Sequence, residues 1–245
     1  MSQLTRRAFV ALSAATLFVS GGHAKAQGRY LFETVKKLAS GEPSVAVGIS
    51  GDSTGNEKWE WVYETFARLA ESFGYTLDYR LYVDGVGYKA QKSLVGGGKL
   101  LTVYNCSVPG KTYNYILSGG RNVSSVFPEP LDLLVTSYGY NHLREKDFGS
   151  MLRKTIEAVK VKYPDAEVAV VVQPTKASSD PDSLGSFERG LSARLMAIQN
   201  GHKVIDVASG FRGNPHLVSA DGIHPNRDGQ AVWTDIAYSD LTTQL

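Results

Sequence analysis

Three short apolar segments, residues 44–49, 131–136 and 167–173, restrict the folds open to this chain. Each is a nearly continuous run of Val, Ile, Leu and Ala, which is typical of strands buried on both faces of a parallel sheet. Amphipathic segments with helical spacing separate or follow them: 57–73, 148–163, 183–200 and 228–241. Strands that alternate with helices predict an α/β fold, a three-layer α/β/α sandwich around a mainly parallel sheet.

The remaining segments fill in the predicted sheet. Residues 29–40 carry apolar side chains at helical spacing and predict a short helix on the sheet edge. Residues 76–83 alternate apolar and polar side chains, which predicts a strand. Residues 84–99 are rich in glycine and predict a long surface loop, either functional or a simple insertion. Residues 100–104 predict a short strand near the sheet edge.

The first 26 residues have the pattern of an export signal. Residues 5–10, Thr-Arg-Arg-Ala-Phe-Val, resemble a twin-arginine motif, and a weakly apolar run follows at 8–19. That run is too short to span a bilayer, which takes about 20 residues. Ala24-Lys25-Ala26 fits a cleavage site, so we expect a mature chain from Gln27 in the periplasm or outside the cell. The alternative is an uncleaved amphipathic N-terminal helix.

Charge and cysteine content exclude several classes of protein. Without residues 1–26, three of the 26 basic residues are lost and the chain has 23 against 24 acidic ones. No general basic signal for nucleic acid or anionic membrane remains. Cys106 is the single cysteine, so no intrachain disulfide can form. The five histidines lack metal-ligand spacing. We therefore expect no metal or other cofactor, and one domain from residue 27 to 245.

A polar turn, residues 50–55, directly follows the first apolar strand and contains Ser53. Ligands of open α/β folds bind at the carboxyl ends of the strands. We also expect this serine near a helix N-terminus, where backbone N–H groups favour developing negative charge. The position suits a nucleophile whose attack creates an oxyanion. Taken alone, Gly-Asp-Ser is more typical of an ordinary helix-capping turn.

A second candidate lies close to the C-terminus. Asp221 and His224 are three residues apart in a loop shaped by Gly222 and Pro225, just before the last predicted helix. At this spacing the carboxylate can contact the imidazole and stabilise its protonated form. His142, His202 and His216 are expected to be surface or structural residues. His216 shares the loop with the pair.

Four short blocks follow one another along the chain: Gly51-Asp52-Ser53-Thr54, Gly110 following Asn105, Gly139-Tyr140-Asn141, and Asp221-Gly222-Ile223-His224-Pro225. In this order they resemble the blocks of the SGNH (GDSL-type) hydrolases. The resemblance covers the whole predicted mature chain and implies a flavodoxin-like sheet. One departure is visible, because the family commonly has Asp after the Asn and this chain has His142.

The resemblance implies a role for each residue. Ser53 would be the nucleophile, His224 the general base and Asp221 the residue that orients the histidine. The oxyanion hole would consist of the backbone N–H groups of Ser53 and Gly110 and the side-chain amide of Asn141. Glycine suits position 110 because its backbone can approach a substrate without a side chain in the way.

The expected function is that of an exported serine esterase that removes short acyl groups, such as acetyl, from a small ester or an acylated carbohydrate. No nucleic-acid partner and no membrane anchor after signal cleavage are expected. One alternative is a non-catalytic carbohydrate-binding module on the same fold. Another is a nucleotide binder that uses the turn at 51–55, which leaves the other three blocks unexplained.

Overall fold

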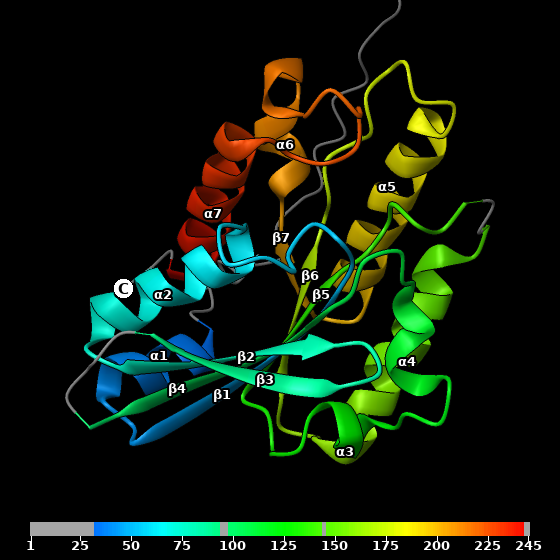
Figure 1. Cartoon of the computed structure of the whole chain (residues 1–245). Helices are drawn as coiled ribbons and strands as arrows, with labels where there is room; N and C mark the ends of the chain where they lie inside the picture. The colour runs from blue at the N-terminus through cyan, green and yellow to red at the C-terminus, as the bar shows by residue number, and fades with distance from the viewer. Residues whose placement is uncertain (1–31, 94–97, 144–145, 243–245) are drawn as a thin grey trace, which may run out of the picture. The chain divides into compact units, whose positions relative to one another are not determined.

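The computed structural model describes residues 32–93, 98–143 and 146–242. Its sheet has seven strands in the order β3-β2-β4-β1-β5-β6-β7 (Figure 1). All neighbouring strands are parallel except β2 and β3, which are antiparallel. The strands are β1 Ser44–Gly51, β2 Thr76–Val83, β3 Gly87–Ser93, β4 Leu100–Ser107, β5 Leu133–Ser137, β6 Glu167–Val171 and β7 Lys203–Ile205.

Helices cover both faces of this sheet, which confirms the predicted α/β/α sandwich. They are α1 Glu33–Ser40, α2 Trp61–Phe73, α3 Val123–Val126, α4 Phe148–Lys162, α5 Ser183–Gln199, α6 Val207–Phe211 and α7 Arg227–Thr242, with 3-10 turns at Tyr113–Leu117 and Pro215–Leu217. The helices α1, α2, α6 and α7 share one hydrophobic core with the sheet. The helices α3, α4 and α5 share a second core on the opposite face (Figure 1).

The pattern of burial explains why the central strands read as continuous apolar runs. Every residue of β1 after Ser44 is buried, and β5 is buried throughout. Successive side chains of a strand point to opposite faces, so such a strand supplies both cores at once. Val135 belongs to one core and the adjacent Leu134 to the other.

Two predictions about the sheet are wrong. The glycine-rich segment 84–99 is not one long loop, because Gly87–Ser93 forms β3 and pairs with β2 as a hairpin. The strand expected at 100–104 is longer and lies inside the sheet: β4 continues to Ser107 between β2 and β1. Asn105 and Ser107 look like loop residues in the sequence, but the strand continues through them, and the N–H of Ser107 donates to Asn105 Oδ1.

Two helices also differ from expectation. The predicted helix 57–73 begins only at Trp61. The first helix does not lie on an edge strand, because α1 packs on the central strand β1. The hydroxyl of its Thr34 donates to the carbonyl oxygen of Asp132 and to the carboxylate of Glu167, at the starts of β5 and β6.

A stacked pair of indoles fixes the last helix against the second. Trp61 of α2 and Trp233 of α7 are both fully buried, and their ring centroids lie 5.4 Å apart. Such an aromatic pair contributes about 0.5–1.5 kcal/mol beyond the burial of its area.

The predicted boundary between residues 26 and 27 lies outside the described residues. None of the described helices is long and apolar enough to cross a membrane.

Candidate active site

Ser53 lies in the turn directly after the central strand β1, half-buried at the carboxyl end of the sheet. The turn is held by its neighbours: Asp52 Oδ1 accepts the backbone N–H and the hydroxyl of Thr54, at 3.1 and 2.9 Å. An aspartate that binds the backbone two residues on fixes such a turn. One expectation is corrected here, because α2 begins at Trp61 and Ser53 is therefore not in its first turn.

The structure brings Ser53, His224 and Asp221 together. The hydroxyl Oγ of Ser53 lies 2.8 Å from Nε2 of His224, although 171 residues separate them in the chain. The other ring nitrogen, Nδ1, lies 2.6 Å from Oδ2 of Asp221. If the imidazole proton is on Nδ1, it is donated to the carboxylate, and Nε2 can accept from the serine hydroxyl. This is the geometry of a nucleophile, a base and a residue that orients the base.

The loop that carries the pair is closed on itself. Asp221 Oδ1 accepts the backbone N–H groups of Ile223 and His224, at 2.9 and 3.0 Å. Gly222 has a φ of 72°, in the left-handed region that glycine adopts without strain. Partial burial acts to raise the pKa of Asp221, but hydrogen bonds from the His224 ring and the two N–H groups outweigh it, so the pKa lies below its usual range. The carboxylate therefore stays ionised opposite the imidazole.

Gln173 links the turn that contains Ser53 to the next strands. Its Nε2 donates to the buried carboxylate of Asp52 at 3.0 Å and also lies 3.3 Å from the hydroxyl of Ser137. Burial raises the pKa of Asp52, and hydrogen bonds from Gln173 and Thr54 partly offset that effect. Gln173 thus donates a hydrogen bond to the carboxylate of Asp52, which has no contact with bulk water.

Gln230, in the first half of α7, supports the turn from the other side. Its Oε1 accepts the backbone N–H of Trp61 at 3.0 Å, and its Nε2 donates to the carbonyl oxygen of Thr54 at 3.2 Å. Both contacts are buried. The helix that follows the His224 loop is therefore connected directly to Thr54, the residue after Ser53. Sequence reasoning missed Gln173 and Gln230. Gln173 offered one signal, a lone polar residue at the end of the most apolar strand.

The two residues predicted to complete an oxyanion hole lie in neighbouring loops. The side-chain amide of Asn141 donates to the carbonyl oxygen of Lys111 at 3.1 Å, next to Gly110. An amide nitrogen has two hydrogens, so one remains for another acceptor. Gly110 is exposed with a φ of 73°, and a Cβ added there would meet no atom within 4 Å. The space beside its backbone is open to a ligand. The roles of Gly110 and Asn141 as oxyanion donors remain predictions.

His142, the departure from the family pattern, has a structural place. It is 4% exposed, its ring stacks on Tyr113 with centroids 4.7 Å apart, and its Nε2 accepts the backbone N–H of Tyr113 at 3.0 Å. Burial, and then the charge of Arg189, lower the pKa of His142 to about 4. A neutral imidazole is the form that can accept this N–H, so the ring holds the loop that follows Gly110.

The other candidates do not join the triad. His216 is exposed, and its backbone carbonyl accepts the side chain of Asn226 at 2.6 Å. Cys106 is buried within β4, and burial raises the pKa of its thiol to about 12, so it is not a reactive thiolate. Within the described ranges, no group of three or more His, Cys, Asp or Glu residues is placed to hold a metal ion.

Neither a protein-family model nor a curated protein matches this sequence. Solved structures do match the fold. A peptidoglycan O-acetylesterase has a TM-score of 0.65 and 12% identity, over 87% of this chain and 95% of that one. A variant of an acetyl xylan esterase from Geobacillus stearothermophilus has a TM-score of 0.59 and 12% identity, over 82% and 96%. A member of the lipolytic G-D-S-L family from Veillonella parvula has a TM-score of 0.53 and 15% identity, over 82% and 100%.

The chain has the SGNH-hydrolase fold. In this SGNH fold three of the four sequence blocks follow central strands: the block with Ser53 follows β1, the block with Gly110 follows β4 and the block with Asn141 follows β5. The D-x-x-H block precedes α7. Parallel strands end at one edge of their sheet, which brings blocks distant in sequence to the same rim.

Proposed function

We propose that this protein is an exported serine esterase that hydrolyses short-acyl, in particular acetyl, esters of a carbohydrate through an acyl-serine intermediate. The observation that carries the proposal is the 2.8 Å contact between Ser53 Oγ and His224 Nε2, with Asp221 on the far side of the ring. A serine hydroxyl is a weak nucleophile at neutral pH and needs a base within hydrogen-bond reach.

The residues can be placed in a reaction sequence. Ser53 Oγ attacks the ester carbonyl carbon while His224 takes the hydroxyl proton, and the carbonyl oxygen becomes an oxyanion. Backbone N–H groups of Ser53 and Gly110 and the amide of Asn141 donate to it; losing one such donor costs about 10²–10³ in rate. The tetrahedral intermediate collapses and His224 gives its proton to the departing alcohol. Water, activated by the same histidine, then releases the acid from Ser53.

The open position of the site favours a short acyl group on a large alcohol. The side chains of His224 and Asp221 are 40% and 47% exposed, so the base lies at the surface rather than at the end of a tunnel. A polymer can reach such a site from solvent, whereas a long acyl chain gains most from an enclosed apolar channel. Two proteins with the same fold are an acetyl xylan esterase and a peptidoglycan O-acetylesterase. These support an acetylated carbohydrate as the substrate class.

Export belongs to the same proposal. Residues 1–26 carry the twin-arginine pattern and the Ala24-Lys25-Ala26 cleavage pattern, and an acetylated polysaccharide of the cell envelope lies on the far side of the membrane. A fusion of residues 1–26 to a reporter, expressed with and without a functional twin-arginine translocase, tests the route. Export that persists without the translocase would contradict it.

The chemistry is tested by a fluorophosphonate probe, which labels activated serines, and by hydrolysis of acetyl, butyryl and long-acyl p-nitrophenyl esters. We expect labelling of the wild type, loss of labelling and of hydrolysis in Ser53→Ala, and a preference for acetyl. Ser40→Ala, an exposed serine at the end of α1, is the matched control and should keep both. A folded wild type that binds acetylated polysaccharide but is neither labelled nor active would instead support the non-catalytic module.

A further inference from the structure

A cavity lies between α2 and α7, the two helices that follow the loops of the triad. Its volume of about 270 Å³ is close to the lower end of the range for ligand sites, about 300–1,000 Å³. The lining residues are Trp59, Glu64, Arg227, Gln230, Ala231, Thr234 and Asp235. Apart from Gln230, which braces the turn of Ser53, these side chains have no part in the proposed reaction.

The cavity borders both loops of the triad. Arg227, the first residue of α7, is three residues after His224, so their Cα atoms are at most about 11 Å apart. Gln230 belongs to the cavity lining, and its Nε2 donates to the carbonyl oxygen of Thr54, the residue after Ser53. The helices α2 and α7 pack side by side (Figure 1). A ligand that reaches Ser53 can therefore extend into this cavity.

Trp59 is the exposed aromatic residue of the cavity. Its side chain is 47% exposed, whereas Trp61 and Trp233, the other two tryptophans, are fully buried. Among the described residues, no ring and no cation stacks on the indole of Trp59. Burial raises the pKa of Glu60 to about 7, and a smaller opposing effect of His224 puts this neighbour of Trp59 within electrostatic reach of the base. The indole thus offers a bare stacking surface beside the triad.

The polar groups around Trp59 suit hydroxyl groups better than an anion or a hydrocarbon. Glu64 and Arg227 are exposed, and within the described ranges neither has an ion-pair partner. Asp235 pairs with Arg68 at 2.8 Å and keeps 74% of its side-chain surface exposed. Two carboxylates against one guanidinium disfavour an anionic ligand, and three charged groups disfavour an acyl chain. A hydroxyl group can both donate to a carboxylate and accept from a guanidinium.

A sugar ring combines the two properties for which this cavity provides partners. Its C–H faces are apolar and can lie flat on an indole, while its hydroxyl groups project from the edge of the ring. In an acetylated polysaccharide the ester is on one unit, and the chain continues through the neighbouring units. When the acetyl group is at Ser53, the cavity between α2 and α7 is placed to receive a neighbouring unit.

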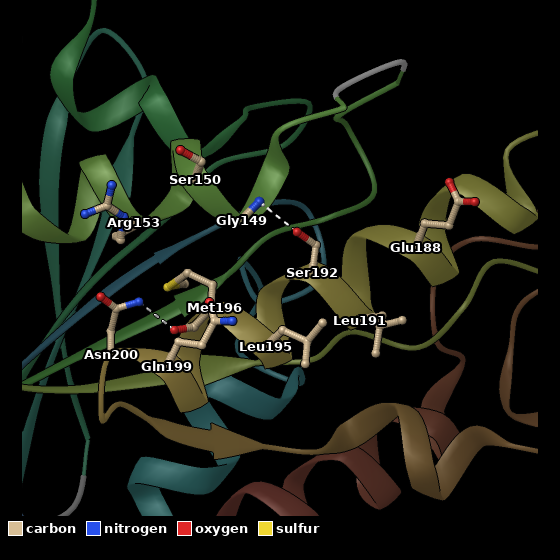
Figure 2. A pocket seen from close by; sticks show the side chains of 10 residues that line it. All are labelled: Gly149, Ser150, Arg153, Glu188, Leu191, Ser192, Leu195, Met196, Gln199 and Asn200. Atoms are coloured by element: carbon tan, nitrogen blue, oxygen red, sulfur yellow. Dashed lines mark hydrogen bonds between the residues drawn. The ribbon is translucent and has the colours of Figure 1, made fainter.

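The larger groove between α4 and α5 lacks this combination. It has a volume of about 630 Å³, and its lining includes Leu191, Leu195 and Arg153 but no aromatic residue (Figure 2). The helices α4 and α5 pack on the other face of the sheet from α2 and α7. Neither directly follows a loop of the triad. Its residues therefore provide controls for substitutions in the cavity between α2 and α7.

We propose that the cavity between α2 and α7 is a carbohydrate subsite, in which Trp59 stacks on a sugar unit next to the acetylated one and Glu64 and Arg227 bind its hydroxyl groups. The inference rests on the proposed esterase function, because it assigns a place to the alcohol part of that ester. It adds no chemical step. Contacts made equally in the bound substrate and in the transition state lower KM and leave kcat as it is.

Kinetics with two acetyl esters of different alcohols test the subsite. Both p-nitrophenyl acetate and an O-acetylated hexasaccharide transfer the same acetyl group to Ser53, but only the hexasaccharide has units that reach the cavity. For Trp59→Ala we expect KM for the acetylated hexasaccharide to rise about tenfold more than KM for p-nitrophenyl acetate, with little change in kcat. Trp59→Phe keeps a ring and should restore part of the loss. Leu191→Ala, also 47% exposed but in the groove between α4 and α5, is the matched control and should change neither KM.

A binding measurement in Ser53→Ala separates the subsite from the chemistry. Iodide should quench the emission of the exposed Trp59 but not that of the buried Trp61 and Trp233. The probes are unacetylated xylohexaose, cellohexaose and chitohexaose, and at least one should protect Trp59 from iodide with a dissociation constant of about 1 mM. Arg227→Gln should weaken this protection several-fold.

The two experiments distinguish failure of the subsite from failure of the esterase. An enzyme active on p-nitrophenyl acetate in which no hexasaccharide protects Trp59, or in which Trp59→Ala affects both esters equally, would overturn the subsite and leave the esterase intact. A protein that neither hydrolyses p-nitrophenyl acetate nor reacts with the fluorophosphonate probe, yet is protected by a hexasaccharide, would reject the esterase and retain the sugar site at Trp59.

Discussion

The carboxylate of Asp221 contacts His224 in two ways: Oδ2 lies 2.6 Å from the ring nitrogen Nδ1, and Oδ1 accepts the backbone N–H of the same residue at 3.0 Å. One side chain thus fixes both the main chain and the imidazole of its partner. The ring cannot turn its Nδ1 toward Ser53 without breaking the shorter contact. The nitrogen that faces the serine is therefore the one free to accept a proton.

The substitution Asp221→Asn removes the negative charge of Asp221 and keeps most of its shape, so it tests how Asp221 orients His224. The amide can keep the contacts to the backbone N–H groups but favours the wrong tautomer of His224, so we expect kcat to fall by about 10⁴ with little change in KM. Steady-state hydrolysis of p-nitrophenyl acetate measures it. Asp228→Asn, an exposed residue in the first turn of α7, is the control and should retain wild-type kcat. Equal activity in both variants would remove Asp221 from the mechanism.

Gly110→Ala tests the predicted oxyanion donor against a matched glycine. Gly110 and Gly120 have φ values of 73° and 78°, and a Cβ at either would meet no atom within 4 Å. The alanine therefore costs about 1–2 kcal/mol of backbone strain at both positions. Only at 110 does it also shift the N–H and crowd the substrate, so we expect kcat to fall at least about tenfold in Gly110→Ala and to hold in Gly120→Ala. Similar kcat values would assign Gly110 to an ordinary turn.

His142 makes stability depend on pH. Its folded pKa of about 4 lies below the unfolded value of about 6.5, so the unfolded chain binds more protons between these values. The stabilisation is complete above about pH 6.5 and is lost as the pH falls to about 4, by roughly 2–3 kcal/mol. His142→Gln keeps an acceptor for the N–H of Tyr113 but cannot titrate there. Urea unfolding from pH 7 to 4.5 should show a shallower loss in the variant; parallel curves would refute the buried neutral histidine.

Glu60 makes stability depend on pH in the opposite direction to His142. Burial raises the pKa of Glu60 to about 7, and backbone N–H groups of Glu57 and Asn56 only partly offset it. The folded chain therefore binds the extra proton, and stability is lost as the pH rises from about 4.5 through 7. Glu60→Gln should gain on the wild type by roughly 2–3 kcal/mol over this range, read from thermal unfolding. Glu64→Gln, on the exposed face of α2, corrects for the removal of one negative charge.

The elements found correctly from sequence are those in which local pattern and burial agree. Residues 131–136 and 167–173 read as buried strands because both faces of β5 and β6 are covered by helices. For the segment Gly87–Ser93 the prediction of a surface loop was wrong. It is an edge strand with polar and glycine residues, and only its pairing with β2 makes it a strand. That pairing is a tertiary interaction that no local window contains.

The candidate site shows the same difference between features that the local sequence indicates and features that depend on tertiary contacts. Ser53, Asp221 and His224 could be found because their chemistry requires particular residue types at particular loops. Gln230 could not, and Gln173 offered only its polarity at the end of an apolar strand, since both satisfy the polar groups of a turn that exists only in the folded chain. The late start of α2 at Trp61 has a related cause: the N–H of Trp61 is satisfied by the side chain of Gln230 from a distant helix rather than by a local cap.

The late position of Gln230 in the sequence has a consequence for the synthesis of the chain. Ser53 is synthesised early, but His224, whose ring contacts it, and Gln230, which braces its turn, come from the C-terminal part of the chain. A polypeptide still attached to the ribosome therefore carries Ser53 without either contact. The site can assemble only after residues 221–230 have been synthesised and have folded onto the turn.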